Sequence, residues 1–153
     1  MRFSFAVLCL TLAIALPSPA FSQTKPHPAQ AEFATAAAGG SKKPGDTVNF
    51  TFKQSYLTKT AVDVITRQAA WLKAHPAVKV RLECHTDDDL EPMDALSFGD
   101  TRCREVEKYL MKNGISAGRI TALSLGNQRP VIKDAKTQEE RGQNRRVVTV
   151  LVQ

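Results

Sequence analysis

Hydrophobic and polar residues alternate with two different periods along the chain from residue 48 onward. Residues 48–52 and 78–84 place apolar side chains at every second position, which is typical of strands with one buried face. Between them, apolar residues recur every three or four positions, which predicts an amphipathic helix. Thr58 is its expected N-cap, and the helix should end at His75 because a following proline disfavours the helical conformation.

The same two periods continue toward the C-terminus. They predict a second helix over 98–110, stopped by Gly114, and a third strand over 120–125. Residues 138–141 fit a short helical turn, and the continuously apolar run 147–152 indicates a strand near the middle of a sheet. The order β-α-β-α-β-(α)-β predicts a two-layer α/β (α+β) sandwich, with helices on one face of a four-stranded mixed sheet.

The first 46 residues lack these patterns. A positively charged start, the apolar run 5–16 and the small and helix-breaking residues 17–22 have the layout of a secretory signal peptide, over residues 1–22. The run is shorter than the roughly 20 apolar residues that a membrane-spanning helix needs. Residues 23–46 are rich in Pro, Ala and Gly and offer little to bury, which predicts a flexible linker before a domain at 47–153.

The predicted export and the distribution of charge limit the partners. The formal charge is +6, from 21 Lys and Arg against 15 Asp and Glu, but the cations are spread along the chain with no basic run. Nucleic acid is therefore not an expected partner. Cys9 lies inside the apolar run instead of at its cleavage end, so a lipid anchor is not expected, and the mature chain should be soluble in the periplasm.

The residues that suggest chemistry lie between the second strand and the second helix. Asp87 follows the strand and Arg102 lies within the first two turns of the helix, so both are expected at one rim of the sheet. A carboxylate beside a guanidinium can hold a zwitterionic amino acid, the first taking the ammonium and the second the carboxylate. On spacing alone, a structural ion pair that closes the loop is the commoner explanation.

Catalytic and metal sites find less support. The acidic loop from Asp87 to Asp94 lacks the glycine turn and the terminal bidentate Glu of a calcium loop. Cys84 and His85 are neighbours on a strand and point to opposite faces, so they do not form a nucleophile pair. No metal, no cofactor and no enzymatic activity is expected.

Four motifs occur in an order that resembles the OmpA-like C-terminal domain, the family shared with peptidoglycan-associated lipoproteins and flagellar stator proteins. They are His85-Thr86-Asp87, Arg102 fifteen residues on, residues 126–130, and Asn144-Arg145-Arg146. The resemblance covers roughly residues 48–152. It implies non-covalent binding of peptidoglycan, in which Asp87 pairs with the ammonium of diaminopimelate and Arg102 with its carboxylate.

The resemblance also implies supporting residues and a location. Thr86, His85 and one of Arg145 and Arg146 would surround the clamp, since neighbouring residues on a strand alternate in direction. Such a domain would tether itself or other envelope proteins to the cell wall in the periplasm, with the outer membrane reached through partners.

Several positions depart from the family pattern. Leu90 stands where the family has Gly, Ala95 where it has a ligand-contacting Asn, and Phe98-Gly99 where it has Leu-Ser. The alternative is therefore a degenerate domain that acts as a protein-interaction or structural module without binding peptidoglycan.

Two further departures are cysteines. Cys84 replaces a Gly before the His, and Cys103 replaces an Ala after the Arg, both where strand and helix should approach closely. The pair could form a disulfide in an oxidising compartment or could simply fill core space as two buried thiols.

Overall fold

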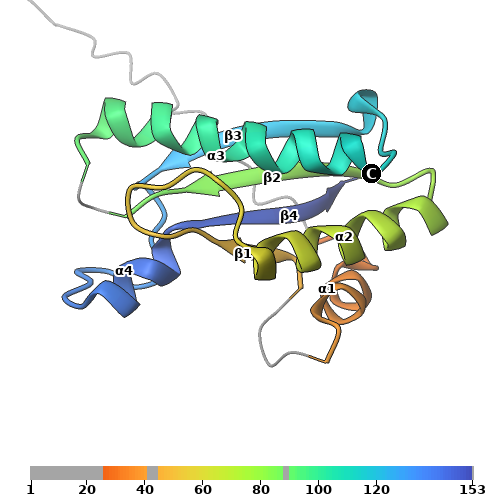
Figure 1. Ribbon diagram of the computed structural model, residues 1–153, viewed down its shortest axis with the longest axis horizontal. Helices are drawn as coiled ribbons and strands as arrows, with labels where there is room; N and C mark the ends of the chain where they lie inside the picture. Colours follow the sequence, from red (N-terminus) through yellow and green to blue (C-terminus); the bar gives the residue numbers. More distant parts are fainter. Residues whose placement is uncertain (1–25, 41–44, 88–89, 153) are drawn as a thin grey trace, which may run out of the picture.

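The structure, a computed structural model, describes residues 26–40, 45–87 and 90–152. The predicted signal peptide, residues 1–22, lies outside the described residues. The elements are, in chain order, α1 (Gln30–Ala38), β1 (Thr47–Asn49), α2 (Lys59–Ala74), β2 (Lys79–His85), α3 (Pro92–Lys112), the 3-10 turn η1 (Ala117–Arg119), β3 (Ile120–Gly126), α4 (Gln138–Asn144) and β4 (Arg146–Val152) (Figure 1).

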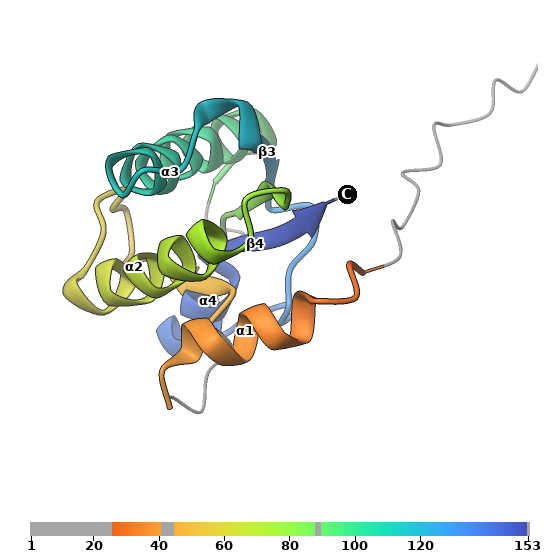
Figure 2. The same ribbon diagram turned by 90° about the vertical axis from the view of Figure 1, so that its right-hand side faces the viewer.

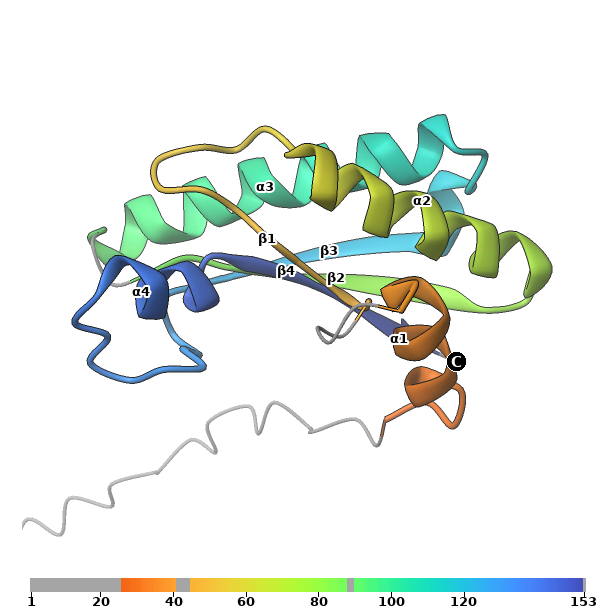
Figure 3. The same cartoon turned by 60° about the horizontal axis from the view of Figure 1, so that its bottom comes forward.

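The strands form one mixed sheet in the order β1-β4-β2-β3. β2 pairs with β3 in parallel, whereas β4 pairs antiparallel with both β1 and β2. The apolar strand β4 is thus central, as its sequence predicts. The fold is the predicted two-layer α/β sandwich, and Figure 3 shows α2 and α3 side by side over the same face of the sheet.

The core lies between this face and the two helices. The alternation of β2 directs Val80, Leu82 and Cys84 into it, and α2 and α3 contribute the apolar residues of their helical stripes. Among these, Ile65, Leu72, Val106 and Leu110 have 0% exposure. Burial of such side chains typically stabilises a fold by about 1.5–3 kcal/mol each.

The predicted element boundaries hold at two helix ends. The Thr58 hydroxyl accepts a hydrogen bond from the Ala61 N–H, as an N-cap does. Gly114 follows α3 with φ 87°, the left-handed conformation that ends helices. The start of α3 differs, because Pro92 at its first turn begins the helix six residues before the expected residue 98. β1 is also shorter than 48–52, ending at Asn49.

The expected linker over 23–46 is wrong for residues 30–38, which form α1 (Figure 2). Phe33 is completely buried, and its ring meets that of Trp71 on α2 edge to face, with the centroids 5.2 Å apart. The Gln30 side chain accepts from the Leu151 N–H and donates to the Thr149 carbonyl of β4. Because β1 is too short to pair with this part of β4, α1 satisfies backbone groups that would otherwise lie open.

Within the described ranges, no helix is both long and apolar enough to cross a membrane.

Candidate functional site

Asp87 lies just beyond the end of β2, where the chain leaves the sheet. The Thr86 N–H donates to the Gly126 carbonyl, so the strand end stays fastened to β3 one residue before Asp87. Asp87 is 4% exposed, and its Oδ2 accepts a hydrogen bond of 2.7 Å from Arg145 Nη1. A buried acid therefore has one oxygen neutralised by a guanidinium that is itself only 5% exposed.

The neighbouring arginines Arg145 and Arg146 point in different directions, as alternation requires. Arg145 extends toward the site, where it also donates to the Gln138 carbonyl. Arg146 donates to the carbonyls of Asn144 and Arg129 instead. Of the two supporting candidates, the structure brings Arg145 to Asp87.

Arg102 is completely buried, which its position in the sequence did not predict. Its guanidinium donates to three main-chain carbonyls, those of Gln54 at 3.1 Å, Thr51 at 3.3 Å and His85 at 3.4 Å. It also lies between two aromatic rings, with its central carbon 5.1 Å from the Phe50 centroid and 4.6 Å from the Phe98 centroid. Burial lowers the pKa of Arg102 to about 10, while the nearby Asp87 raises it and Arg145 lowers it. The group remains a cation at neutral pH.

Asp87 and Arg102 therefore lie near each other without a direct ion pair among the described contacts. Asp87 reaches Arg145, and Arg102 reaches carbonyl oxygens on either side of the loop that follows β1. The ion pair between Asp87 and Arg102, which spacing alone favoured, is not among the described contacts. Asp87 pairs with Arg145 instead.

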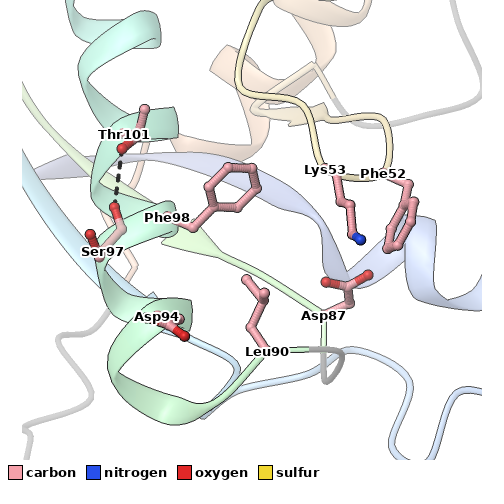
Figure 4. A pocket seen from close by; sticks show the side chains of 8 residues that line it. All are labelled: Phe52, Lys53, Asp87, Leu90, Asp94, Ser97, Phe98 and Thr101. Atoms are coloured by element: carbon pink, nitrogen blue, oxygen red, sulfur yellow. Dashed lines mark hydrogen bonds between the residues drawn. The ribbon is translucent and has the colours of Figure 1, made fainter.

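A pocket of about 390 Å³ opens beside Asp87 (Figure 4). One wall comes from α3, with Phe98 projecting into the space, and the opposite wall comes from the loop after β1, with Phe52 and Lys53. The residues that line it are Phe52, Lys53, Asp87, Leu90, Asp94, Ser97, Phe98 and Thr101. Opposite charges around an apolar centre suit a small amphipathic zwitterion.

His85 and Thr86 are buried beside this pocket. His85 is 3% exposed, and burial lowers its pKa to about 4, helped by the positive charges of Arg146 and Arg129. His85 Nδ1 and Thr86 Oγ1 lack hydrogen-bond partners within the described part of the chain. His85 is therefore a neutral ring at pH 7. Thr86 lines a separate pocket with Asn127 and Asn144, next to the one beside which Asp87 lies. The supporting role of His85 and Thr86 stays a prediction.

Cys84 and Cys103 form a disulfide, with their Cα atoms 5.7 Å apart. Of the two alternatives that the sequence left open, the structure shows the bridge. Both residues are completely buried, one on β2 and one on α3. The bridge joins the two elements at positions next to His85 and Arg102.

The departures from the family pattern have distinct consequences. Leu90 lines the pocket and adds apolar surface to it. Ala95 is completely buried where α3 approaches the left-handed residue Gly126, at which a Cβ would lie 3.3 Å from that of Ala95. Phe98 stacks on Arg102 and lines the pocket as well. The site thus has a more apolar wall than the family pattern implies.

The sequence did not single out four of the residues that line the pocket, which are Phe52, Lys53, Ser97 and Thr101. Phe52 lies in the strand expected over 48–52, and Lys53 belongs to none of the motifs in the sequence. No local signal marks Phe52 and Lys53, because the strand ends at Asn49 and the turn that carries them is held by Arg102 from α3.

Comparison with known proteins agrees with this architecture. A model of the OmpA family matches residues 49–145. The peptidoglycan-associated lipoprotein of Agrobacterium fabrum is 31% identical over 157 residues, covering 95% of this chain and 86% of the relative. That of Brucella melitensis is 33% identical over 108 residues, which span 70% of this chain and 63% of the relative's length.

Solved structures show the same fold. The crystal structure of the peptidoglycan-associated lipoprotein from Burkholderia pseudomallei superposes with a TM-score of 0.66 at 25% identity, covering 70% of this chain and 90% of that one. The C-terminal domain of Helicobacter pylori MotB superposes with a TM-score of 0.60 at 21% identity, covering 69% and 84%. The chain belongs to the OmpA family. Its folded part is an OmpA-like domain of the type found in peptidoglycan-associated lipoproteins.

Proposed function

We propose that this domain binds peptidoglycan without covalent chemistry, through the diaminopimelate of the peptide stem, and so tethers an envelope component to the cell wall. The observation that carries the proposal is the pocket beside Asp87, at the position of the family's ligand-binding acid. The names of the relatives, which are peptidoglycan-associated lipoproteins, point to the same polymer.

The charges around the pocket support a zwitterionic ligand. Arg145 occupies Asp87 Oδ2, and among the described residues no donor reaches Oδ1, which is therefore available to a ligand ammonium. Arg102 lies beneath the pocket wall formed by Phe98 and contributes a positive charge that draws the ligand carboxylate. Two charges of opposite sign on one amino-acid end would thus meet complementary groups.

The rival function is that of an interaction module that keeps the fold and has lost the ligand. It is favoured by Leu90 and Ala95, which replace the Gly and the ligand-contacting Asn of the family. A lost hydrogen bond of this kind costs on the order of 1 kcal/mol, or about five-fold in affinity. We therefore propose weakened binding, with the apolar wall of Leu90 and Phe98 replacing part of the lost contact.

Co-sedimentation with purified diaminopimelate-type sacculi tests the proposal. The mature protein should sediment at moderate salt and be released by soluble stem peptides in excess. Absence of sedimentation would favour the interaction module. Sedimentation that disappears with salt and resists competition by stem peptide would mean that a basic protein adheres to an anionic polymer. Release of soluble wall fragments during the assay would contradict the non-enzymatic assignment.

A further inference from the structure

The loop after β1 presents Lys53 to the pocket in an unusual conformation. The Gln54 N–H donates to the Thr51 carbonyl at 3.2 Å, which closes a tight turn around Phe52 and Lys53. Lys53, the third residue of this turn, has φ 53°. Glycine or asparagine is favoured at such a position, because an L side chain is strained there. Strained residues of this kind concentrate at ligand sites.

Arg102 fastens both ends of the same turn. Its guanidinium donates to the Thr51 carbonyl and to the Gln54 carbonyl, the first and last residues of the turn. All of this occurs in a buried position, with the guanidinium enclosed by Phe50 and Phe98. Two of the hydrogen bonds that Arg102 donates therefore hold the turn in place, and the buried guanidinium offers no exposed N–H to a ligand in this conformation.

Lys53 is the one Lys or Arg among the described residues that line the pocket. It is exposed, and its ammonium lies 5.2 Å from the centroid of the Phe52 ring, which is itself part of the pocket wall. Figure 4 shows the Lys53 side chain directed from the loop toward the Asp87 side of the pocket. An ammonium and a carboxylate of the protein thus face the same space from different elements.

We infer that Lys53 contacts the free carboxylate of the ligand at the pocket mouth, while Arg102 is a positioning residue that holds the turn carrying it. This inference rests on the proposed function and deepens it. The site then selects a stem residue whose far end carries both an ammonium and a carboxylate. A stem residue with an ammonium alone, such as lysine, would satisfy Asp87 and leave Lys53 without a partner.

Two synthetic stem peptides test the inference by titration calorimetry. One contains diaminopimelate linked at one end only, and the other contains lysine in the same position, which differs by the loss of that free carboxylate. Lys53→Gln should weaken binding of the diaminopimelate peptide by up to about five-fold, the upper end for a solvent-exposed charge pair, and leave binding of the lysine peptide unchanged. Lys79→Gln is the matched control, because Lys79 is exposed at the opposite end of β2 from Asp87.

Lys53→Gly separates recognition from folding. Glycine relieves the strain at φ 53°, so this variant should melt at the wild-type temperature or above while losing the same factor in affinity. Wild-type affinity of both Lys53 variants for the diaminopimelate peptide would overturn the inference, and so would an equal loss for the lysine peptide. Wild-type protein that binds neither peptide would instead overturn the proposed function itself.

Discussion

At the scale of single residues, the site consists of buried charged side chains, each of which has its own polar or aromatic partners. Asp87 has Arg145 as its partner, and Arg102 has three carbonyls and two aromatic rings. The order and spacing of the motifs predicted that Asp87 and Arg102 lie near each other, and their charges do interact. The sequence did not predict that Arg102 would be buried, because burial depends on how the turn after β1 folds over α3, a contact between residues about 50 positions apart.

His85 gives the residue-scale prediction. Its pKa falls from 6.5 to about 4 in the folded state, so the unfolded chain binds a proton over a range where the folded chain does not. The His85 contribution to stability is therefore fully present above pH 6.5 and is lost as the pH falls toward 4. The loss should reach up to about 3 kcal/mol.

The measurement is urea unfolding of the wild type and of His85→Gln between pH 7 and pH 4. Because carboxylates also titrate in this range, the difference between the two proteins is the relevant quantity. The wild type should lose more of its free energy of unfolding than the variant as the pH falls. Parallel pH profiles would show that His85 is not held neutral by its surroundings.

At the scale of elements, periodicity predicted the helices and strands that build the sandwich and missed α1. A helix of nine residues with five alanines and a single large apolar side chain has almost no amphipathic pattern to detect. Tertiary contacts hold this helix in place. Phe33 enters the core beside Trp71, and Gln30 satisfies backbone groups of β4 that the short strand β1 leaves unpaired. Neither partner is visible from the local sequence.

Phe33→Ala should undock α1 from the rest of the domain. Removing a fully buried Phe typically costs about 3–5 kcal/mol, and here the loss would expose the edge of β4 as well. Urea unfolding gives the cost, and amide exchange over residues 30–38 should become fast. Thr35→Ala on the exposed face of the same helix is the control. Wild-type stability and exchange in Phe33→Ala would mean that residues 30–38 act as the linker first expected.

At the scale of the whole molecule, the disulfide joins the strand and the helix that carry the site. Cys84 and Cys103 are 19 residues apart, and closing a loop of this length contributes about 3 kcal/mol in the chain-entropy model. The sequence shows that cysteines replace a Gly and an Ala of the family pattern, and in an exported domain such a pair can form a disulfide. Whether the two sulfurs meet depended on the packing of α3 against β2.

The double substitution Cys84→Ala with Cys103→Ala should lower the free energy of unfolding by about 3 kcal/mol. Thiol titration of the denatured, unreduced wild-type mature protein should find no free thiol, since the predicted cleavage removes Cys9. Two reactive thiols in that sample, or equal stability of the two proteins, would contradict the bridge.

The central claim is that the pocket beside Asp87 binds the zwitterionic end of a stem residue. The most direct measurement is the affinity of the diaminopimelate stem peptide for the wild type, Asp87→Asn and the control Asp63→Asn, which removes an exposed acid from α2. Asparagine keeps an oxygen for Arg145, so thermal melting can verify that the variant is folded. The account predicts at least about ten-fold weaker binding for Asp87→Asn and none of this loss for Asp63→Asn. A folded Asp87→Asn protein that binds the peptide as tightly as the wild type would contradict it.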